Sequence, residues 1–516
     1  MTRTATELGA GLAPARRSRP IQAGERIHIL GIAGAGASAA ALHAKAAGAI
    51  VTGCDPGGPS PYTVALEAAR IPIEWAHHPA HVGVHPPPNR LAVTKALTAI
   101  APDHPELAAA AKAGIPVEPW QQLVADAAHG RELIAVAGTH GKSTTAGWLT
   151  WLLAEAGLDP SAFVGALLPA ALTGTVPATA RIGAGESFIV EADEYAGNFD
   201  SYFPDRVTLT TVEWDHPDVF ADRDAVIEAF ATWLARVPEA TVVANLEDPG
   251  VVDVLSELWA RNSQSGGLVG ISVVSADTAS ARPAKASKIL IDDRLIALVS
   301  AQGPDGTMLE IGGIEGEPVR RVHLPVTGLH NASNALVALA VAIGARGAAS
   351  MGSDRFLLAL ASFPGIGRRL ERKGEARGVA VYDDYGHHPT AVRATLAALR
   401  QREPGRRVWA VYEPLTFHRT AAMLDDFADA LAEADAVAIA DIWASRDLDT
   451  TVTSPEALAG AVRTRRPEIP VAATGTVEET AAWLAENVRE GDAVLVMGGG
   501  RSYRIAELLL VHLESS

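Results

Sequence analysis

Short apolar runs alternate with longer segments of helical periodicity along most of the chain, and this alternation predicts an α/β fold with mostly parallel sheets. Strands are expected at 26–31, 50–52, 133–137, 187–191, 207–212, 379–382, 407–412, 436–440 and 493–497. Helices are expected between them, including an alanine-rich helix that ends near Ala47 and helices over 107–113, 146–156 and 329–344. Such sheets bind their ligands at the carboxyl ends of the strands, so we expect functional residues to follow the strands directly.

The succession of elements over 516 residues predicts three domains, at about 150 residues for each. We expect a flexible tail over residues 1–24 and a Rossmann-like domain over 25–130. A central P-loop-type ATP-binding domain is expected over 131–366, and a second Rossmann-like domain over 367–516.

A glycine-rich turn lies between the strand expected at 133–137 and the helix expected at 146–156. Its sequence, Val136-Ala-Gly-Thr-His-Gly-Lys-Ser-Thr-Thr145, ends in the Gly-Lys-Ser of a P-loop, although the first P-loop glycine is replaced by Val136. Backbone N–H groups and the helix N-terminus would face an anion, with Lys142 at the outer phosphates and Ser143 at a magnesium ion. The alternative is a turn that only joins a strand to a helix.

The first expected strand leads into a second glycine-rich turn. Gly34, Gly36 and Ala39 fit the dinucleotide-binding pattern G-x-G-x-x-A, and Asp55 follows the next strand. This pattern alone is weak evidence, and it favours a nucleotide-type ligand more than it favours NAD.

Acidic clusters follow two strands of the central domain. Glu191-Ala-Asp193-Glu194 places three carboxylates together, which repel one another unless a cation such as Mg²⁺ lies between them. Asp215-His216 follows the next strand, where His216 is either a metal ligand or an ordinary loop histidine. The alternative for the Glu191 cluster is an acidic loop in water.

Composition narrows the possible partners. The net charge of −17 argues against a nucleic-acid backbone as the main partner. The single cysteine, Cys54, excludes a disulfide within the chain and fits a reducing compartment. Because no apolar run approaches the ~18 residues that span a bilayer, we expect a cytoplasmic protein without membrane insertion, either monomer or homodimer.

Taken together, these motifs resemble the Mur ligases, the ATP-dependent enzymes that build the peptidoglycan precursor, over nearly the whole chain. The resemblance assigns the turn at Gly138, Thr139, His140, Gly141, Lys142, Ser143 and Thr144 to ATP. It assigns Ser143, Glu191 and His216 to Mg²⁺, and His330, Asn331 and Asn334 to adenine and ribose. The arginine pair Arg368-Arg369 is implied to lie near the γ-phosphate, with Arg368 as the residue that neutralises its charge.

The resemblance also implies the reaction. Within the family, the motifs are most similar to those of the member that joins L-alanine to UDP-N-acetylmuramate through an acyl phosphate, with Gly34, Gly36 and Asp55 in the UDP-sugar site. His387 and Arg419 would contact substrate, and either His388 or Asp384 would be the base. The sequence departs from this member at Leu415, where a histidine is usual. The alternatives are a recycling ligase that joins a murein tripeptide, and a regulatory protein that binds nucleotide without catalysis.

Overall fold

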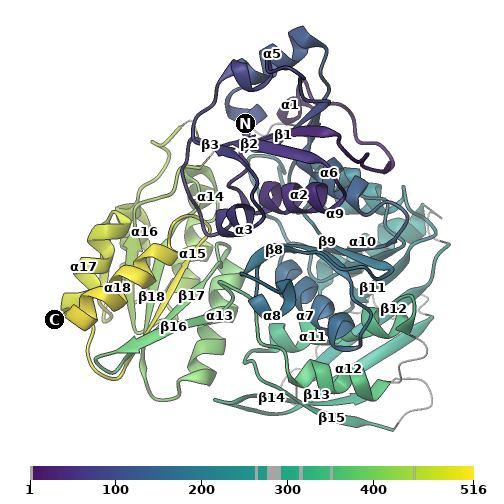
Figure 1. Cartoon of the computed structure of the whole chain (residues 1–516). Coiled ribbons are helices and arrows are strands. Elements are labelled where there is room, and N and C mark those ends of the chain that lie inside the picture. Colours follow the sequence, from purple (N-terminus) through teal and green to yellow (C-terminus); the bar gives the residue numbers. More distant parts are fainter. Residues whose placement is uncertain are drawn as a thin grey trace.

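The computed structural model describes residues 4–261, 265–275, 292–312, 318–348, 353–445, 447 and 449–515, and it consists of three α/β domains (Figure 1). Each domain is built on one sheet, and most neighbouring strands run parallel. The expected fold class is therefore confirmed.

The N-terminal sheet has the strand order β3-β2-β1-β4-β5, and all its pairs are parallel. The order reverses between β1 and β4, the position at which open α/β sheets bind ligands. Its strands are β1 (Arg26–Leu30), β2 (Ile50–Cys54), β3 (Ile73–Glu74), β4 (Arg90–Val93) and β5 (Val117–Pro119). Its helices are α1 (Ala5–Leu8), α2 (Ala35–Ala46), α3 (Thr63–Ala68), η1 (Pro79–His81), α4 (Lys95–Ile100), α5 (Pro105–Ala113) and α6 (Trp120–Ala127).

The central sheet has ten strands in the order β15-β14-β13-β12-β11-β10-β6-β9-β7-β8. Strand β8 and the last two strands at the other edge, β14 and β15, pair antiparallel. The strands are β6 (Glu132–Ala137), β7 (Ser161–Leu168), β8 (Ala178–Arg181), β9 (Ser187–Ala192), β10 (Arg206–Leu209), β11 (Thr241–Asn245), β12 (Leu268–Ser275), β13 (Asp293–Gly303), β14 (Gly306–Gly312) and β15 (Arg320–Leu324). The helices are α7 (Lys142–Glu155), α8 (Ala170–Thr173), η2 (Tyr195–Ser201), α9 (Arg223–Leu234), α10 (Pro249–Ala260), α11 (Leu329–Gly344) and α12 (Ser353–Ala361).

The C-terminal sheet has the order β16-β17-β21-β18-β19-β20, with only β16 antiparallel to its neighbour. Its strands are β16 (Glu371–Ala376), β17 (Val379–Asp384), β18 (Arg407–Glu413), β19 (Ala436–Ala440), β20 (Val471–Gly475) and β21 (Asp492–Gly498). Its helices are α13 (Pro389–Arg402), α14 (Phe417–Ala422), α15 (Leu424–Leu431), α16 (Pro455–Arg465), α17 (Val477–Asn487) and α18 (Tyr503–Ser515).

The central strand β6 shows why these runs are continuously apolar. All six of its residues are buried, and their side chains alternate between two cores. Ile134 and Val136 pack with α7 and α11, whereas Leu133 and Ala135 face the core on the opposite side of the sheet. A parallel strand covered on both faces needs apolar residues at every position, so its pattern is a run and not an alternation.

The start of one expected helix differs from the structure, and the expected domain boundaries are not tested by it. Helix α7 begins at Lys142, four residues before the expected start, because Gly141 adopts the left-handed backbone that ends the turn (φ +81°). The expected domain boundaries, including a flexible segment over 1–24, stay a prediction; in the structure Arg16 forms ion pairs with Glu118 (2.9 Å) and Asp126 (2.8 Å). None of the helices in the described ranges is long and apolar enough to cross a membrane.

Candidate active site

The turn between β6 and α7 forms the floor of the site. Gly138 has φ +133°, and a Cβ at this position would lie 2.2 Å from Thr210 Oγ1. A Cβ at Gly141 would lie 2.3 Å from the side-chain oxygen of Asn334 on α11. Only glycine fits either position, so the close approach of β10 and α11 fixes the course of the turn.

Lys142 occupies the first position of α7 with its ammonium group turned back into the turn. Its Nζ donates to the carbonyl oxygens of Gly138 (2.5 Å) and Thr139 (3.2 Å), and it forms an ion pair with Glu194 (3.1 Å). Burial favours the neutral amine, but the carboxylates of Glu194, Asp193 and Glu191 outweigh it and hold the pKa of Lys142 above its usual value. The residue is therefore a fixed positive charge at the helix N-terminus.

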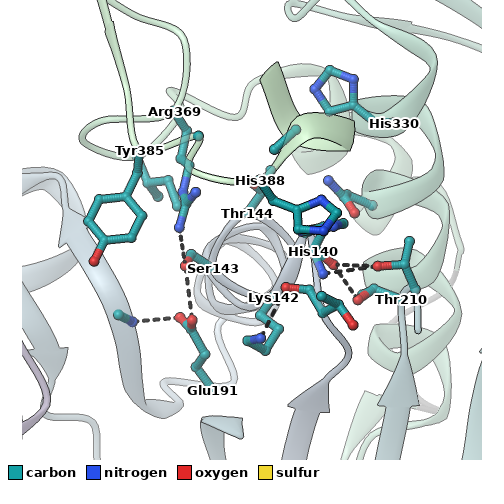
Figure 2. Close-up of a pocket in the computed structure, with 18 of the residues that line it drawn as sticks. His140, Lys142, Ser143, Thr144, Glu191, Thr210, His330, Arg369, Tyr385 and His388 are labelled. Carbon is teal, nitrogen blue, oxygen red and sulfur yellow. Dashed lines mark hydrogen bonds between the residues drawn. The ribbon is translucent and has the colours of Figure 1, made fainter. Parts of the chain in front are cut away.

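A chain of hydrogen bonds connects three elements next to this lysine, as Figure 2 shows. Ser143 Oγ donates to Glu191 Oε1 (3.0 Å), and the backbone N–H of Gly165 donates to Glu191 Oε2 (2.6 Å). Arg369 Nη2 in turn donates to Ser143 Oγ (2.8 Å). The structure thus places the predicted metal ligands Ser143 and Glu191 in direct contact.

The third predicted metal ligand, His216, lies in a separate group. Its ring approaches Asp193 and Glu194, with one ligand atom of each residue within 4.8 Å of the others. Burial, together with the neighbouring Asp193, raises the pKa of Glu194 to about 7 despite the opposing charge of Lys142. Such carboxylates are suited to a divalent cation, which would relieve their repulsion.

Arg419 of α14 reaches this group from the C-terminal domain. Its Nη2 contacts Asp215 Oδ1 (2.7 Å) and His216 Nδ1 (3.0 Å), and its side chain is almost fully buried. Burial disfavours the Asp215 carboxylate, but the guanidinium outweighs this effect and holds the pKa of Asp215 well below its usual value. Arg419 was predicted to contact substrate, whereas the structure places it behind His216, outside the lining of the main cavity.

The main cavity has a volume of about 480 Å³ and is lined by residues of all three domains, with Trp120 and Gln121 from the N-terminal one. It is lined by the turn at the start of α7, by Glu191 and by the residues expected at adenine and ribose: His330, Asn331 and Asn334. Arg369, Asp384, His387, His388 and Leu415 line it from the C-terminal domain. One cavity therefore joins a phosphate-binding turn to a pocket of imidazoles and carboxylates.

The two arginines of the predicted pair lie in different surroundings. Arg368 donates to Asp383 Oδ2 (3.0 Å) and to the Gly498 carbonyl oxygen (2.8 Å), within the C-terminal domain and outside the cavity lining. Arg369 lines the cavity, and its buried Nε has no hydrogen-bond partner among the described residues. The sequence implied that the pair lies near the γ-phosphate and named Arg368; of the two, only Arg369 lines the cavity, and the assignment itself stays a prediction.

The predicted bases are both constrained by hydrogen bonds. His388 caps α13 by accepting from the Thr390 N–H (3.3 Å), and its other ring nitrogen contacts the Trp214 carbonyl oxygen (3.1 Å). Asp384 accepts backbone N–H bonds from Leu370 (2.7 Å) and Gly386 (2.7 Å). The ring of His140 packs against that of His388 at a tilt of 45°, with ring centroids 4.6 Å apart, and His140 contacts Glu213 at 2.9 Å.

His387 differs from both. Its Nδ1 contacts the Tyr385 carbonyl oxygen (2.8 Å), so this nitrogen carries the proton, and Nε2 is an acceptor without a hydrogen-bond partner among the described residues. Burial lowers the pKa of His387 well below its usual value, which keeps the ring neutral. The residue therefore presents a hydrogen-bond acceptor in the part of the cavity lined by Leu415.

The first glycine turn lies next to this cavity, outside its lining. Asp55 accepts from the Ala33 N–H (3.1 Å), which fixes the turn that ends at Gly34, the N-cap of α2. A Cβ at Gly36 would lie 2.2 Å from the ring of Trp120, a residue that lines the main cavity. Trp120 thus packs against the first glycine turn and also lines the cavity, and no motif in the sequence marked it.

Comparisons with known proteins cover the same three domains. Family models match residues 26–132 (Mur ligase family, catalytic domain), 136–342 (Mur ligase middle domain) and 368–500 (Mur ligase, glutamate ligase domain). A UDP-N-acetylmuramate–L-alanine ligase of Frankia casuarinae is 35% identical and covers 95% of this chain and 98% of its own. A protein of the same name from Roseiflexus castenholzii is also 35% identical, covering 94% and 97%.

Solved structures agree with this assignment at the level of the fold. The UDP-N-acetylmuramate-alanine ligase of Thermotoga maritima superposes with a TM-score of 0.74 at 21% identity, covering 95% of this chain and 99% of that one. A murein peptide ligase from Psychrobacter arcticus has a TM-score of 0.69 at 26% identity, covering 96% and 99%. By its sequence over nearly the whole length and by its three-domain fold, the chain belongs to the Mur ligase family.

Proposed function

We propose that this chain joins L-alanine to UDP-N-acetylmuramate, coupled to the conversion of ATP to ADP and phosphate. One observation carries the proposal: a single cavity contains both the phosphate-binding turn at Lys142 and the neutral imidazole of His387. The curated relatives at 35% identity that bear this activity in their names support the choice of L-alanine.

The proposed reaction requires both a phosphate-binding part and an amino-acid-binding part of the cavity. A free carboxylate is a poor electrophile, so the substrate carboxylate first takes the γ-phosphoryl group of ATP and becomes an acyl phosphate. The amine of L-alanine then attacks the acyl carbon, and phosphate leaves. Catalysis of both steps depends mainly on positioning and on neutralising the charge of the phosphoryl oxygens.

Two cations of the chain would provide that neutralisation. Lys142 is held at the N-terminus of α7 by Glu194, and Arg369 extends over the same helix end to Ser143. The unpartnered Nε of Arg369 has a donor to offer to an anion. The backbone N–H groups of the first turn of α7 face the same point.

The residues of the central domain fit Mg²⁺. Ser143 and Glu191 would hold one ion through a hydroxyl and a carboxylate, ligands that Mg²⁺ prefers. Asp193, Glu194 and His216 form a second group that would accept a cation. A bound Mg²⁺ would supply positive charge to the phosphate oxygens.

His387 is the residue best placed to accept a hydrogen bond from the ammonium group of the amino acid. Its Nε2 has no hydrogen-bond partner among the described residues, whereas the ring nitrogens of His388 and both carboxylate oxygens of Asp384 are engaged in hydrogen bonds. The sequence predicted His388 or Asp384 as the base, and those assignments stay predictions. The expected cytoplasmic location stays a prediction as well.

The test is phosphate release by the purified protein with Mg²⁺, ATP and UDP-N-acetylmuramate, in parallel reactions with L-alanine, glycine, L-serine and a murein tripeptide. We expect turnover only when UDP-N-acetylmuramate and an amino acid are both present, and most with L-alanine. Turnover with the tripeptide alone would replace this proposal by the recycling reaction. Nucleotide binding without turnover on any acceptor would indicate a regulatory protein.

A further inference from the structure

A cluster of metal-ligating side chains lies in the N-terminal domain, away from the cavity described above. His28 of β1, Cys54 at the end of β2, His81 of η1 and Glu106 of α5 converge, with one ligand atom of each within 4.8 Å of the others. Four separate elements contribute one residue each. We propose that these four residues form a binding site for Zn²⁺.

Four contacts within the cluster have the spacing expected around a tetrahedral ion. With Zn–N bonds of about 2.0–2.1 Å and a Zn–S bond of about 2.3 Å, tetrahedral geometry places neighbouring ligand atoms roughly 3.3–3.8 Å apart. His28 Nε2 lies 3.4 Å from both Cys54 Sγ and Glu106 Oε2. Cys54 Sγ lies 3.4 Å from Glu106 Oε1, and His81 Nδ1 lies 3.3 Å from the same oxygen.

The ligand types favour zinc over the magnesium of the ATP site. Thiolate and imidazole are typical ligands of Zn²⁺, whereas Mg²⁺ prefers oxygen. His28, Cys54 and Glu106 are nearly or fully buried, and His81 is partly exposed, which leaves a route for the ion. The set is closed by four protein ligands, as in structural zinc sites.

The ring of His28 is held through its second nitrogen by a hydrogen bond, as is usual for histidines that bind zinc. Nδ1 of His28 contacts Thr52 Oγ1 at 2.9 Å, which holds the ring with Nε2 toward Cys54 and Glu106. His77 adds another imidazole beside the group, with Nδ1 3.1 Å from Cys54 Sγ. Zinc binding would require the Cys54 thiol to lose its proton.

Zinc at this position would connect the sheet to the segment between β3 and α5. His28 and Cys54 belong to neighbouring parallel strands, whereas His81 and Glu106 come from η1 and α5, which pack together beyond the sheet. The ion would therefore stabilise the packing of these elements in the N-terminal domain. The ligand Cys54 directly precedes Asp55, whose carboxylate holds the first glycine turn by accepting from the Ala33 N–H.

The test uses the full-length protein, freed of metal with a chelator and then titrated with Co²⁺ in excess Mg²⁺. We expect one equivalent to bind with the visible absorption of four-coordinate cobalt and a thiolate-to-cobalt charge-transfer band in the near ultraviolet. Because Cys54 is the only cysteine of the chain, a thiolate band can arise only from this site. Saturating Co²⁺ without that band would overturn the proposal.

Variants separate metal binding from hydrogen bonding within the cluster. We expect Cys54→Ser to lose the thiolate band and His81→Ala to weaken Zn²⁺ binding at least tenfold. The control, His129→Ala, removes an exposed histidine outside the cluster and should leave binding unchanged. His81 has a side chain that is 18% exposed, so its variant should fold, which circular dichroism checks.

Zinc should also raise the melting temperature of the wild-type protein and of His129→Ala, but not that of His81→Ala. Wild-type affinity for Zn²⁺ in a folded His81→Ala protein would show that His81 is not a ligand and would overturn the four-residue site. None of these measurements depends on ATP or on the proposed ligase reaction.

Discussion

Removing either of the two neighbouring arginines at the start of the C-terminal domain should affect a different property of the protein: activity for one and stability for the other. Arg369 lines the cavity and contacts Ser143 at the N-terminus of α7, where phosphate is expected. Arg368 is paired with Asp383, whose side chain is fully buried. The variants Arg369→Ala and Arg368→Ala therefore separate a loss of catalysis from a loss of stability.

The magnitudes follow from these surroundings. Removing one preorganised donor to a developing anionic charge lowers kcat by about 10²–10³. Removing one partner of a buried ion pair destabilises a protein by about 3–5 kcal/mol, because the other charge remains unpaired. For a domain of this size, each kcal/mol shifts the melting temperature by about 2–4 °C. Arg368→Ala should therefore melt at least ~6 °C lower, and Arg369→Ala should melt like the wild type.

The assay measures phosphate release under saturating substrates and melting by circular dichroism for both variants, with wild type as the control. Release should fall by about 10²–10³ in Arg369→Ala without a change in melting. If Arg369→Ala keeps activity within tenfold and Arg368→Ala loses it without melting earlier, the reasoning is refuted. The phosphate contact would then belong to Arg368, as the sequence motif implied.

Three further predictions concern charge at other positions. Lys142→Ala should abolish phosphate release, because it removes the fixed charge at the head of α7; residual activity within tenfold of wild type would contradict this role. Glu191→Gln should raise the Mg²⁺ concentration that gives half-maximal release at least tenfold, and an unchanged requirement would exclude Glu191 as a ligand. Burial raises the pKa of Glu413 to about 7, so the folded protein favours the neutral form of this carboxyl group. The resulting contribution to the free energy of unfolding is greatest below about pH 4.5 and is lost as the pH rises through 7. The melting temperature of Glu413→Gln, which stays neutral, should therefore rise relative to wild type between pH 4.5 and 7, and a constant difference would argue against the raised pKa.

Much of the fold could be predicted because buried parallel strands have a distinct sequence pattern. Apolar runs such as 133–137 and 493–497 became β6 and β21, since strands covered on both faces need apolar residues throughout. The antiparallel pairing of β14 and β15 at the edge of the central sheet did not follow from that pattern. Pairing partners depend on which strand edges remain open once the sheet has formed.

The residues of the candidate site also divide into those that the sequence predicted and those that it did not. Gly138 to Thr144 form one continuous segment, so their sequence was sufficient to predict a phosphate-binding turn. Trp120 was missed because its importance comes from contact with Gly36, and contacts across elements leave no local motif. Arg368 and Arg369 could not be distinguished, because adjacent side chains of one type differ only in the direction that the folded backbone gives them.

The sequence by itself therefore determined the fold class and the resemblance to the Mur ligases, and it predicted a phosphate-binding turn, because each depends on residues that are close along the chain. Only the tertiary structure decided that Arg369 reaches Ser143, that His387 Nε2 has no hydrogen-bond partner among the described residues, and that His28, Cys54, His81 and Glu106 meet. The physical reason is that ion pairs, hydrogen bonds and metal sites act over a few ångströms of space. Residues 78 positions apart, such as His28 and Glu106, come within that range only when packing of the hydrophobic core brings their elements together.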